Sequence, residues 1–216
     1  MVNAQRAQAE RMPDSLRRLD ESPDEEFYAQ PRFVTHIDDE AIAAVTRLYR
    51  EYLPADGAIL DLMSSWVSHL PPGVAYRRVA ILGMNERELA RNERATEYVV
   101  RNLNAFPTLP YGDCEFDGCG VCVSIDYLTR PVEVLREVGR VLKPNAPLVI
   151  TFSNRCFPTK AVLAWHALDD AGHVELVKSF VRSSAMFEKP IGLDRTPHPR
   201  RSDPLYAVVA LRRLPM

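Results

Sequence analysis

The sequence predicts a single α/β domain built on a doubly wound, mostly parallel sheet of seven strands with a C-terminal antiparallel strand. Short apolar runs bounded by turn residues alternate with helical segments, a pattern typical of parallel strands joined by right-handed crossovers. The chain has 216 residues, of which 46% are hydrophobic. One domain of that size can bury roughly 70% of its unfolded surface without metals or disulfides.

The N-terminal quarter divides into two parts. Residues 1–26 are expected to form a flexible arm, because many charges and two prolines, Pro13 and Pro23, interrupt a weak helical pattern. From Phe27 the segment FYAQPRFVTHID brings several rings together. Asp38 is then expected to cap a helix that ends before Pro54 and buries Ile42, Val45, Leu48, Tyr49 and Tyr52.

The rest of the chain supplies the strands and crossover helices. Strands are predicted at 58–62, 78–83, 97–103, 119–125, 147–152, near Ile191 and at 206–211. A short helix is expected to follow the first strand, within 63–70, and about two helical turns are expected over 85–92. A longer helix starts near Pro131, with Thr129 as its cap and with ion pairs Glu133–Arg136 and Glu137–Arg140 on its wet side. Two further helices are predicted at 159–168 and 171–183.

Composition excludes several classes of function. A net charge of −2 and a pI near 6.2 give no basic face for nucleic acid, and the RTPHPRR cluster at 195–201 is interpreted as a solvated loop. No apolar run reaches 18 residues and the N-terminus is polar, so we expect a cytoplasmic protein with no membrane contact. The four cysteines are expected to be free thiols. Cys119 and Cys122 should point to opposite faces of a strand, so no metal is expected.

Ligands of doubly wound sheets bind outside the carboxyl ends of the strands, where the strand order reverses. That rule selects the residues that follow each predicted strand. They are 61–65, 83–85, 102–104, 124–127 and, after the fifth strand, 153–156.

The segment LPYGDCEFDGCGVCVSIDYLTRPVEVLREVGRVLKPNAPLVI, residues 109–150, resembles class I S-adenosylmethionine-dependent methyltransferases of the type 11 kind. It has the LPF-type turn, the acidic FD pair, a strand, a polar loop, a helix ending in RVLKP and a second strand. Asn145 and Ala146 stand where two glycines are usual. The resemblance covers about 28–211, most strongly 109–154, and implies a Rossmann-like methyltransferase fold with S-adenosyl-L-methionine as cofactor.

The first loop departs from that family. Its glycine-rich turn would fall at 63–67, where no glycine occurs; side chains then replace bare backbone, and turns with positive φ are disfavoured. Serine hydroxyls and the N–H groups of the short helix remain to bind the amino-acid end of the cofactor. The resemblance also implies that Asn85, with Glu86 beside it, binds the ribose and that Asn102 binds the adenine amine. The full set of expected cofactor contacts is Tyr28, Arg32, Asp61, Met63, Ser64, Ser65, Gly83, Met84, Asn85, Asn102, Leu103, Asn104 and Ser124.

Few catalytic side chains are needed for an in-line methyl transfer. Asp126 and Tyr127 follow the fourth strand, where the family places groups facing the methyl, so they are candidates to orient or deprotonate a nucleophile. His36 is a candidate general base, with a helix cap as its alternative role. Asn154 and Arg155 are expected to line the acceptor side.

Three functions compete on these residues. The first is methyl transfer to a small-molecule acceptor at oxygen, nitrogen, sulfur or carbon, with 27–57 as lid and helix, 58–155 as cofactor-binding core and 156–216 on the acceptor side. The second is a catalytically inactive methyltransferase-like binding or scaffold protein, since the glycines are missing. A nicotinamide-dependent oxidoreductase ranks last, because no G-x-G-x-x-G turn follows the first strand.

Overall fold

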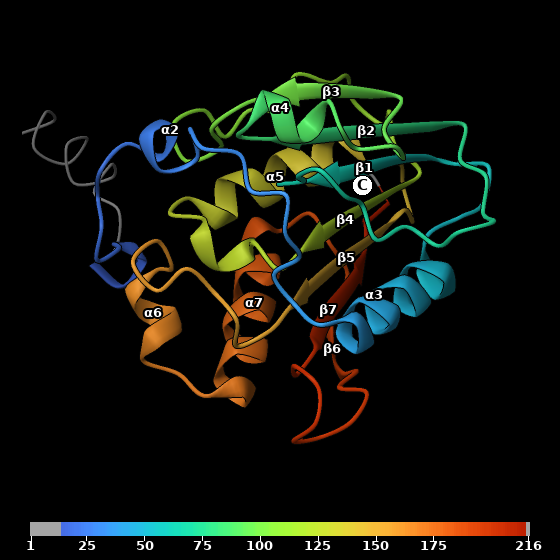
Figure 1. Cartoon of the computed structure of the whole chain (residues 1–216). Coiled ribbons are helices and arrows are strands. Elements are labelled where there is room, and N and C mark those ends of the chain that lie inside the picture. The colour runs from blue at the N-terminus through green and yellow to red at the C-terminus, as the bar shows by residue number, and fades with distance from the viewer. Residues whose placement is uncertain (1–13, 215–216) are drawn as a thin grey trace, which may run out of the picture.

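The computed structural model describes residues 14–214 and shows a seven-stranded sheet between two helical layers (Figure 1). The strand order is β3-β2-β1-β4-β5-β7-β6. β1 to β5 are parallel, whereas β7 runs antiparallel to both β5 and β6. The predicted doubly wound, mostly parallel fold with a C-terminal antiparallel strand is confirmed. The strands are β1 (Ala58–Leu62), β2 (Arg78–Gly83), β3 (Glu97–Val100), β4 (Gly118–Cys122), β5 (Pro147–Phe152), β6 (Ile191–Asp194) and β7 (Tyr206–Leu211).

Helices cover both faces of this sheet. α3 (Asp39–Tyr52) packs on one face, and α5 (Pro131–Val141) and α7 (Asp170–Ser184) pack together on the other (Figure 1). The remaining helical pieces are single turns: η1 (Asp14–Leu16), α2 (Asp24–Phe27), α4 (Glu86–Leu89), η2 (Ile125–Tyr127) and α6 (Leu163–His166). All five residues of β1 are buried, with Leu60 in the α5 and α7 core and Ile59 in the α3 core. Burial on both faces explains why this strand reads as an uninterrupted apolar run.

α3 and α5 begin where the sequence predicts, but only α3 has the predicted capping residue. Asp38 caps α3 by accepting a hydrogen bond from the Ala41 N–H at 2.9 Å. α5 begins at Pro131, but Arg130 occupies the cap position and no side chain caps the helix, so the prediction for Thr129 is wrong. The Thr129 N–H instead donates to Asn104 Oδ1.

Of the two ion pairs predicted on α5, one forms. Arg140 lies 2.8 Å from Glu137, as predicted. Glu133 pairs with Arg130 and not with Arg136. Arg130 lies three residues before Glu133, a spacing at which side chains on a helix are neighbours.

Several predicted segments differ in length or type, among them β3, which ends at Val100 and not at 103. No helix forms within 63–70, because Ser64 and Ser68 both donate to Asp61 and so compete with helical hydrogen bonding. The helices expected over 85–92 and 159–168 shrink to the single turns α4 and α6. β4 ends at Cys122 rather than at 125, since Val123 adopts φ 42°, a conformation that no strand contains.

Residues 14–38, which we call the N-terminal strap, run across the carboxyl edge of the sheet, from η1 beside α6 to α2 near the end of β3 and back to α3 (Figure 1). Arg18 forms an antiparallel bridge with Val162, and Asp24 is only 5% exposed. The prediction of a flexible arm is therefore wrong for 14–26, where buried ion pairs compensate for the weak apolar pattern; residues 1–13 lie outside the described part. Within 14–214, none of the helices has the length and apolar character of a membrane span.

Candidate functional site

A cleft lies between the carboxyl ends of the strands and the N-terminal strap. Its volume is about 1230 Å³, including the solvent at its mouth. The tails of β1, β2, β3 and β4 form the inner wall, and strap residues between Arg18 and His36 form the outer wall. This is the position at which the strand order reverses between β1 and β4, as the fold rule requires.

The residues expected to contact the cofactor all line this one cleft. Sequence separation is no obstacle, because parallel strands deliver their carboxyl ends to the same edge. The set comprises Tyr28, Arg32, Asp61, Met63, Ser64, Ser65, Gly83, Met84, Asn85, Asn102, Leu103, Asn104 and Ser124. Their convergence is observed, whereas their contacts with a cofactor stay predictions.

The glycine-free loop after β1 is held by its own hydrogen bonds. Asp61 is 5% exposed and accepts from Ser64 Oγ at 2.6 Å and from Ser68 Oγ. Burial raises the pKa of Asp61, and the two serine hydroxyls partly oppose that rise. Asn92 adds a donor to Ser68 Oγ at 2.9 Å. The hydroxyl of Ser64, expected to face the cofactor, is thus already paired inside the protein.

The same loop makes the tight turn that its sequence disfavours. Met63 adopts φ 57°, a left-handed conformation that costs a non-glycine residue roughly 1–2 kcal/mol. The Ser64 N–H then donates to Leu82 O at 2.7 Å, which lays the loop over the end of β2. A Cβ at Gly83 would collide with the Ser64 carbonyl oxygen. The close approach of backbones therefore depends on a glycine in β2 and not on one in the loop.

The end of β2 supplies a carboxylate that the sequence analysis overlooked. Asn85 caps α4 with its Oδ1 and donates from Nδ2 to Tyr28 O at 2.8 Å, so its amide is fully used. Glu86 is exposed and outside the cleft. Glu88 lines the cleft and accepts from Ser65 Oγ and from the Arg32 N–H, each at 2.6 Å. The sequence feature that could have indicated Glu88 is its position, three residues after the asparagine that caps α4.

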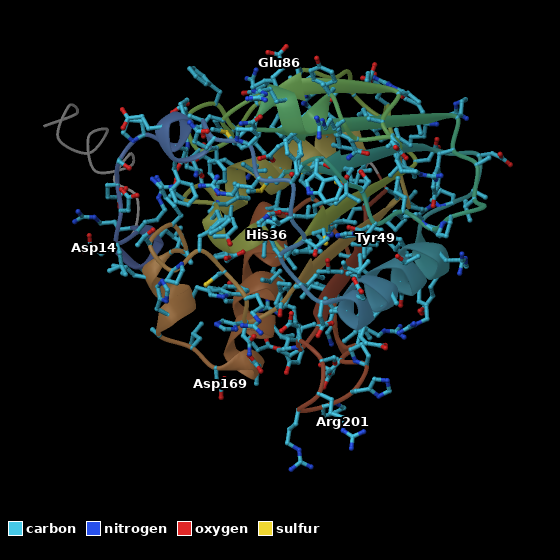
Figure 2. All side chains as sticks on the ribbon, viewed as in Figure 1. Asp14, His36, Tyr49, Glu86, Asp169 and Arg201 are labelled. Carbon is cyan, nitrogen blue, oxygen red and sulfur yellow. The ribbon has the colours of Figure 1, made fainter. Side chains whose placement is uncertain are left out.

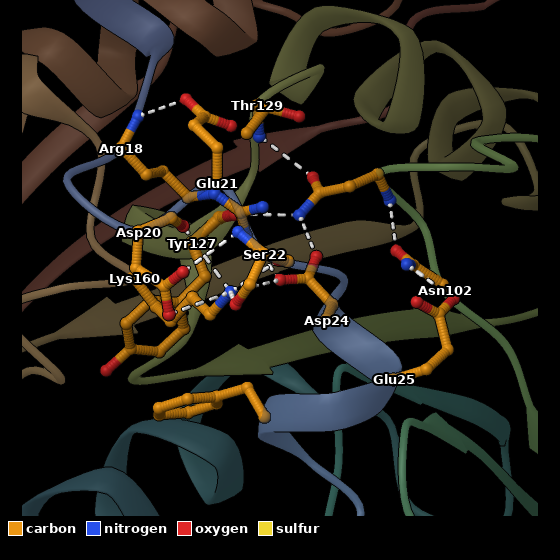
Figure 3. Close-up of polar contacts among 12 residues, drawn as sticks. Arg18, Asp20, Glu21, Ser22, Asp24, Glu25, Asn102, Tyr127, Thr129 and Lys160 are labelled. Carbon is orange, nitrogen blue, oxygen red and sulfur yellow. Dashed lines mark hydrogen bonds and ion pairs between the residues drawn. The ribbon is translucent and has the colours of Figure 1, made fainter.

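The asparagines after β3 hold the N-terminal strap (Figure 3). Asn102 Nδ2 donates to Glu25 at 2.8 Å, and its Oδ1 accepts from the Asn104 N–H at 2.9 Å. Asn104 Nδ2 donates to Asp24 at 2.9 Å and to Tyr127 O at 3.0 Å. Both side chains act as turn formers and anchors here, the alternative role of any asparagine at a strand end.

The two candidates after β4 separate. Asp126 is 3% exposed, does not line the cleft, and its Oδ2 has no hydrogen-bond partner among residues 14–214. Burial raises the pKa of Asp126 to about 7. Tyr127 lines the cleft, but its hydroxyl accepts from the Phe157 N–H at 2.9 Å, and burial raises its pKa well above the ordinary value. The prediction that Asp126 faces the cleft is wrong, because β4 ends three residues early and η2 turns this side chain inward.

Two histidines line the cleft. His36, labelled in Figure 2, belongs to the strap, and its ring centre lies 5.2 Å from that of Phe157, edge to face. Asp38, not His36, caps α3, so the alternative role for His36 is excluded. His69 also lines the cleft. The sequence did not predict this, because in the segment 63–70 only the serines, Met63 and the backbone N–H groups were expected to meet the cofactor. Burial lowers the pKa of both histidines, which leaves a neutral imidazole able to accept a proton near pH 7.

The residues expected on the acceptor side lie elsewhere. Neither Asn154 nor Arg155 lines the cleft. The Arg155 side chain is 63% exposed and its Nε lies 2.7 Å from Asp203 Oδ1, so it ties the end of β5 to the loop before β7. The structure therefore does not bring these two residues to the cleft, and substrate binding by them stays a prediction. The cleft residue from this segment is Phe157.

Aromatic contacts fasten the strap over the cleft. The guanidinium carbon of Arg32 lies 4.6 Å from the centre of the Phe27 ring and 5.3 Å from that of Phe157. Phe33 and Trp66 meet edge to face at 6.4 Å. These contacts join the strap to both sides of the strand edge, and rings with this geometry exclude water from a site.

Comparison with known proteins defines the class. A family model described as a methyltransferase domain matches residues 75–150. No curated protein gave a significant match. Among solved structures, an S-adenosylmethionine-dependent methyltransferase from Mesorhizobium loti shares 15% identity over 78% of this chain and 98% of its own, with a TM-score of 0.54.

Two other structures have the same fold. One, from Thermotoga maritima, is a methyltransferase described as a possible histamine N-methyltransferase, with 15% identity, coverage of 81% and 91%, and a TM-score of 0.56. The other is the 4+2 cyclase SpnF, with 16% identity, coverage of 79% and 81%, and a TM-score of 0.56. At such identities the likeness concerns the fold, which is the Rossmann-like methyltransferase fold.

The match to the methyltransferase domain over residues 75–150, together with the shared fold, supports a class I methyltransferase that uses S-adenosylmethionine as its cofactor.

Proposed function

We propose that this enzyme transfers a methyl group from S-adenosylmethionine to a small-molecule acceptor held under the N-terminal strap. The observation that carries the proposal is the enclosure of the cleft. The strap covers it from outside, where Val34 O accepts from Trp66 and the Arg32 guanidinium lies over Phe157, so the space suits a small molecule better than a macromolecular surface. In this proposal 27–57 act as lid and helix, 58–155 as cofactor-binding core and 156–216 on the acceptor side.

The cofactor supplies an electrophilic methyl carbon on a sulfonium. The acceptor nucleophile forms a bond to that carbon as the carbon–sulfur bond breaks, leaving S-adenosylhomocysteine, and the acceptor's proton passes to a base. His36 and His69 are the bases that the cleft offers, because both line it and partial desolvation lowers the pKa of each imidazole. We expect the strap to limit the access of water, which would compete for the acceptor site.

The adenosyl part is proposed to lie along the tails of β2 and β3. There, Glu88 would accept the ribose hydroxyls in place of Ser65, whose Oγ now lies 2.6 Å away. Leu103 would cover the base, since it is the apolar residue of the β3 tail that lines the cleft. Met63 and the backbone of the β1 loop would border the aminoacyl end.

Thermal unfolding with S-adenosylmethionine, S-adenosylhomocysteine, NADH and ATP in turn tests the proposal. A ligand at a hundred times its Kd adds about 2.7 kcal/mol of stability. Only the two sulfur nucleosides should raise the midpoint. A response to NADH alone, or to none of the four, would contradict the proposed cofactor site.

The alternative is a binding or scaffold role without turnover. It is favoured by the internal pairing of polar groups expected to meet the cofactor, above all Ser64 with Asp61 and Asn85 with Tyr28 O. Stabilisation by S-adenosylhomocysteine without any acceptor-dependent release of that product, across a panel of phenols, amines and thiols, would support it.

A further inference from the structure

We propose that Arg18 forms a carboxylate-binding subsite on the outer wall of the cleft and that the acceptor carries a carboxylate. The inference rests on the proposed function and names the substrate class of that site. It begins from an arginine that is buried, lines the cleft and uses only part of its hydrogen-bonding capacity.

Arg18 is held firmly at one nitrogen. Its Nη1 lies 2.5 Å from Asp24 Oδ1, and the side chains are only 7% and 5% exposed. Within residues 14–214, this is the single hydrogen bond made by the guanidinium, and the buried Nε has no partner. The edge formed by Nε and Nη2 is therefore unused. That edge presents two parallel N–H donors, the geometry that matches a carboxylate.

Asp24 has no capacity left to satisfy that edge (Figure 3). Its Oδ1 also lies 3.5 Å from Lys160 Nζ, and its Oδ2 accepts from Asn104 at 2.9 Å. Lys160 is fully buried and is itself occupied by Ser22 O at 2.7 Å and by Asp20 at 3.3 Å. The surrounding cluster fixes the guanidinium in place and leaves its free edge to a ligand.

A buried donor without an acceptor is unfavourable, and more so when the group is charged. A second one lies in the same cleft: Ser124 is 7% exposed and its Oγ has no partner among the described residues. A ligand with several acceptor oxygens would satisfy both donors. Lys160 has no free donor, so the one unused guanidinium edge, with its two N–H groups, suits a carboxylate better than a phosphate.

The carboxylate is assigned to the acceptor and not to the aminoacyl end of the cofactor. Arg18 pairs with Val162 in a β-bridge and shares Asp24 with Lys160, and both of those residues follow β5. The loop expected to border the aminoacyl end follows β1, on the far side of β4 in the sheet order. The two carboxylate sources are separable by experiment.

The test uses the full chain, with benzoate and its neutral isostere benzamide as probes. Midpoints of thermal unfolding are measured with and without saturating S-adenosylhomocysteine. Benzoate should raise the midpoint and benzamide should not. Arg18→Lys retains the charge beside Asp24 but loses the fork, and should weaken benzoate binding at least tenfold. Ser124→Ala should weaken it as well, and Arg17→Lys, at an exposed neighbour, should leave it unchanged.

Equal responses to benzoate and benzamide would overturn the subsite. A loss of S-adenosylhomocysteine affinity in Arg18→Lys equal to the loss for benzoate would overturn the assignment to the acceptor. The proposed function fails separately, if the wild-type protein shows no response to S-adenosylhomocysteine; the arms without that nucleoside still test whether Arg18 distinguishes benzoate from benzamide.

Discussion

The indole Nε1 of Trp66 donates a hydrogen bond to the carbonyl oxygen of Val34 at 3.0 Å. This bond joins the two walls of the cleft, because Trp66 belongs to the loop after β1 and Val34 to the N-terminal strap. Beside it, Glu88 accepts from both Ser65 and the Arg32 backbone. We therefore expect a ligand that displaces the loop to displace the strap as well.

Trp66→Phe tests this connection. The ring remains to contact Phe33, but the N–H is lost, so we expect a destabilisation of about 1 kcal/mol and faster amide exchange in residues 28–36. Association of S-adenosylhomocysteine should become faster. The matched control is Trp165→Phe, because the Trp165 Nε1 has no partner among the described residues. Unchanged exchange in the strap of Trp66→Phe would show that the bond does not hold it.

Gly83→Ala should disturb the cleft from the opposite wall. The added methyl would meet the Ser64 carbonyl oxygen and approach Leu89 at 3.0 Å, so the loop after β1 must shift. Overpacking of this kind costs typically 1–3 kcal/mol, and affinity for S-adenosylhomocysteine, measured by calorimetry, should fall. Gly112→Ala is the control, since its methyl would meet only the Glu115 carboxylate at 3.4 Å. Equal midpoints for both variants would contradict the close approach at Gly83.

Asp126→Asn should change the pH dependence of stability. Burial raises the pKa of Asp126 from 3.8 to about 7, so between about pH 4 and 7 the folded state binds more protons than the unfolded state. Its contribution therefore lowers stability as pH rises through that window, by at most about 1.4 kcal/mol per unit. The amide does not titrate, so the substitution removes this slope. The variant should be the more stable protein at pH 8 and about equal to wild type below pH 4, as measured by denaturant titration.

The opposite sign is expected at Asp20, which provides the control for the pH experiment. Hydrogen bonds from Ser22 lower the pKa of Asp20 to about 2, so its stabilising contribution is present above pH 4 and lost as pH falls towards 2. Asp20→Asn should leave the slope between pH 4 and 7 intact. A flattened slope in this variant, or an unaltered one in Asp126→Asn, would contradict the assignment to Asp126.

Lys160→Met should destabilise strongly. The ammonium is fully buried and contacts the Ser22 carbonyl and two carboxylates; removing one partner of a buried pair costs about 3–5 kcal/mol. Chemical unfolding measures it. Lys143→Met is the matched control, because Lys143 pairs with Asp117 at 2.7 Å while 41% exposed, and exposed pairs contribute about 1 kcal/mol or less. Similar losses in the two variants would mean that the strap cluster contributes little.

The strands and main helices could be predicted because their patterns are local. β1, β2, β5 and β7 have the predicted limits, since buried parallel strands read as apolar runs between turns. The carboxyl-edge rule correctly brought the expected cofactor-binding residues to one cleft for the same reason: Asn85 and Asn102 follow strands whose ends lie at the same edge of the sheet.

The parts that failed depend on contacts distant in sequence. Lys160 holds Ser22 and Asp24 across more than a hundred positions, so residues 14–26 read as a loose arm when viewed alone. Asp126 points inward because β4 ends early, at Cys122, where Val123 adopts a positive φ. Neither Val123 nor an adjacent residue is a glycine or proline, so the sequence does not indicate this break. Arg155 pairs with Asp203, 48 residues later in the sequence, and does not line the cleft.

The left-handed bend at Met63 has a practical consequence. A search for cofactor loops that counts glycines would miss this chain, because the residue that adopts the positive φ is a methionine. Screening torsion angles, with a small residue required on the adjoining strand as at Gly83, would recover it.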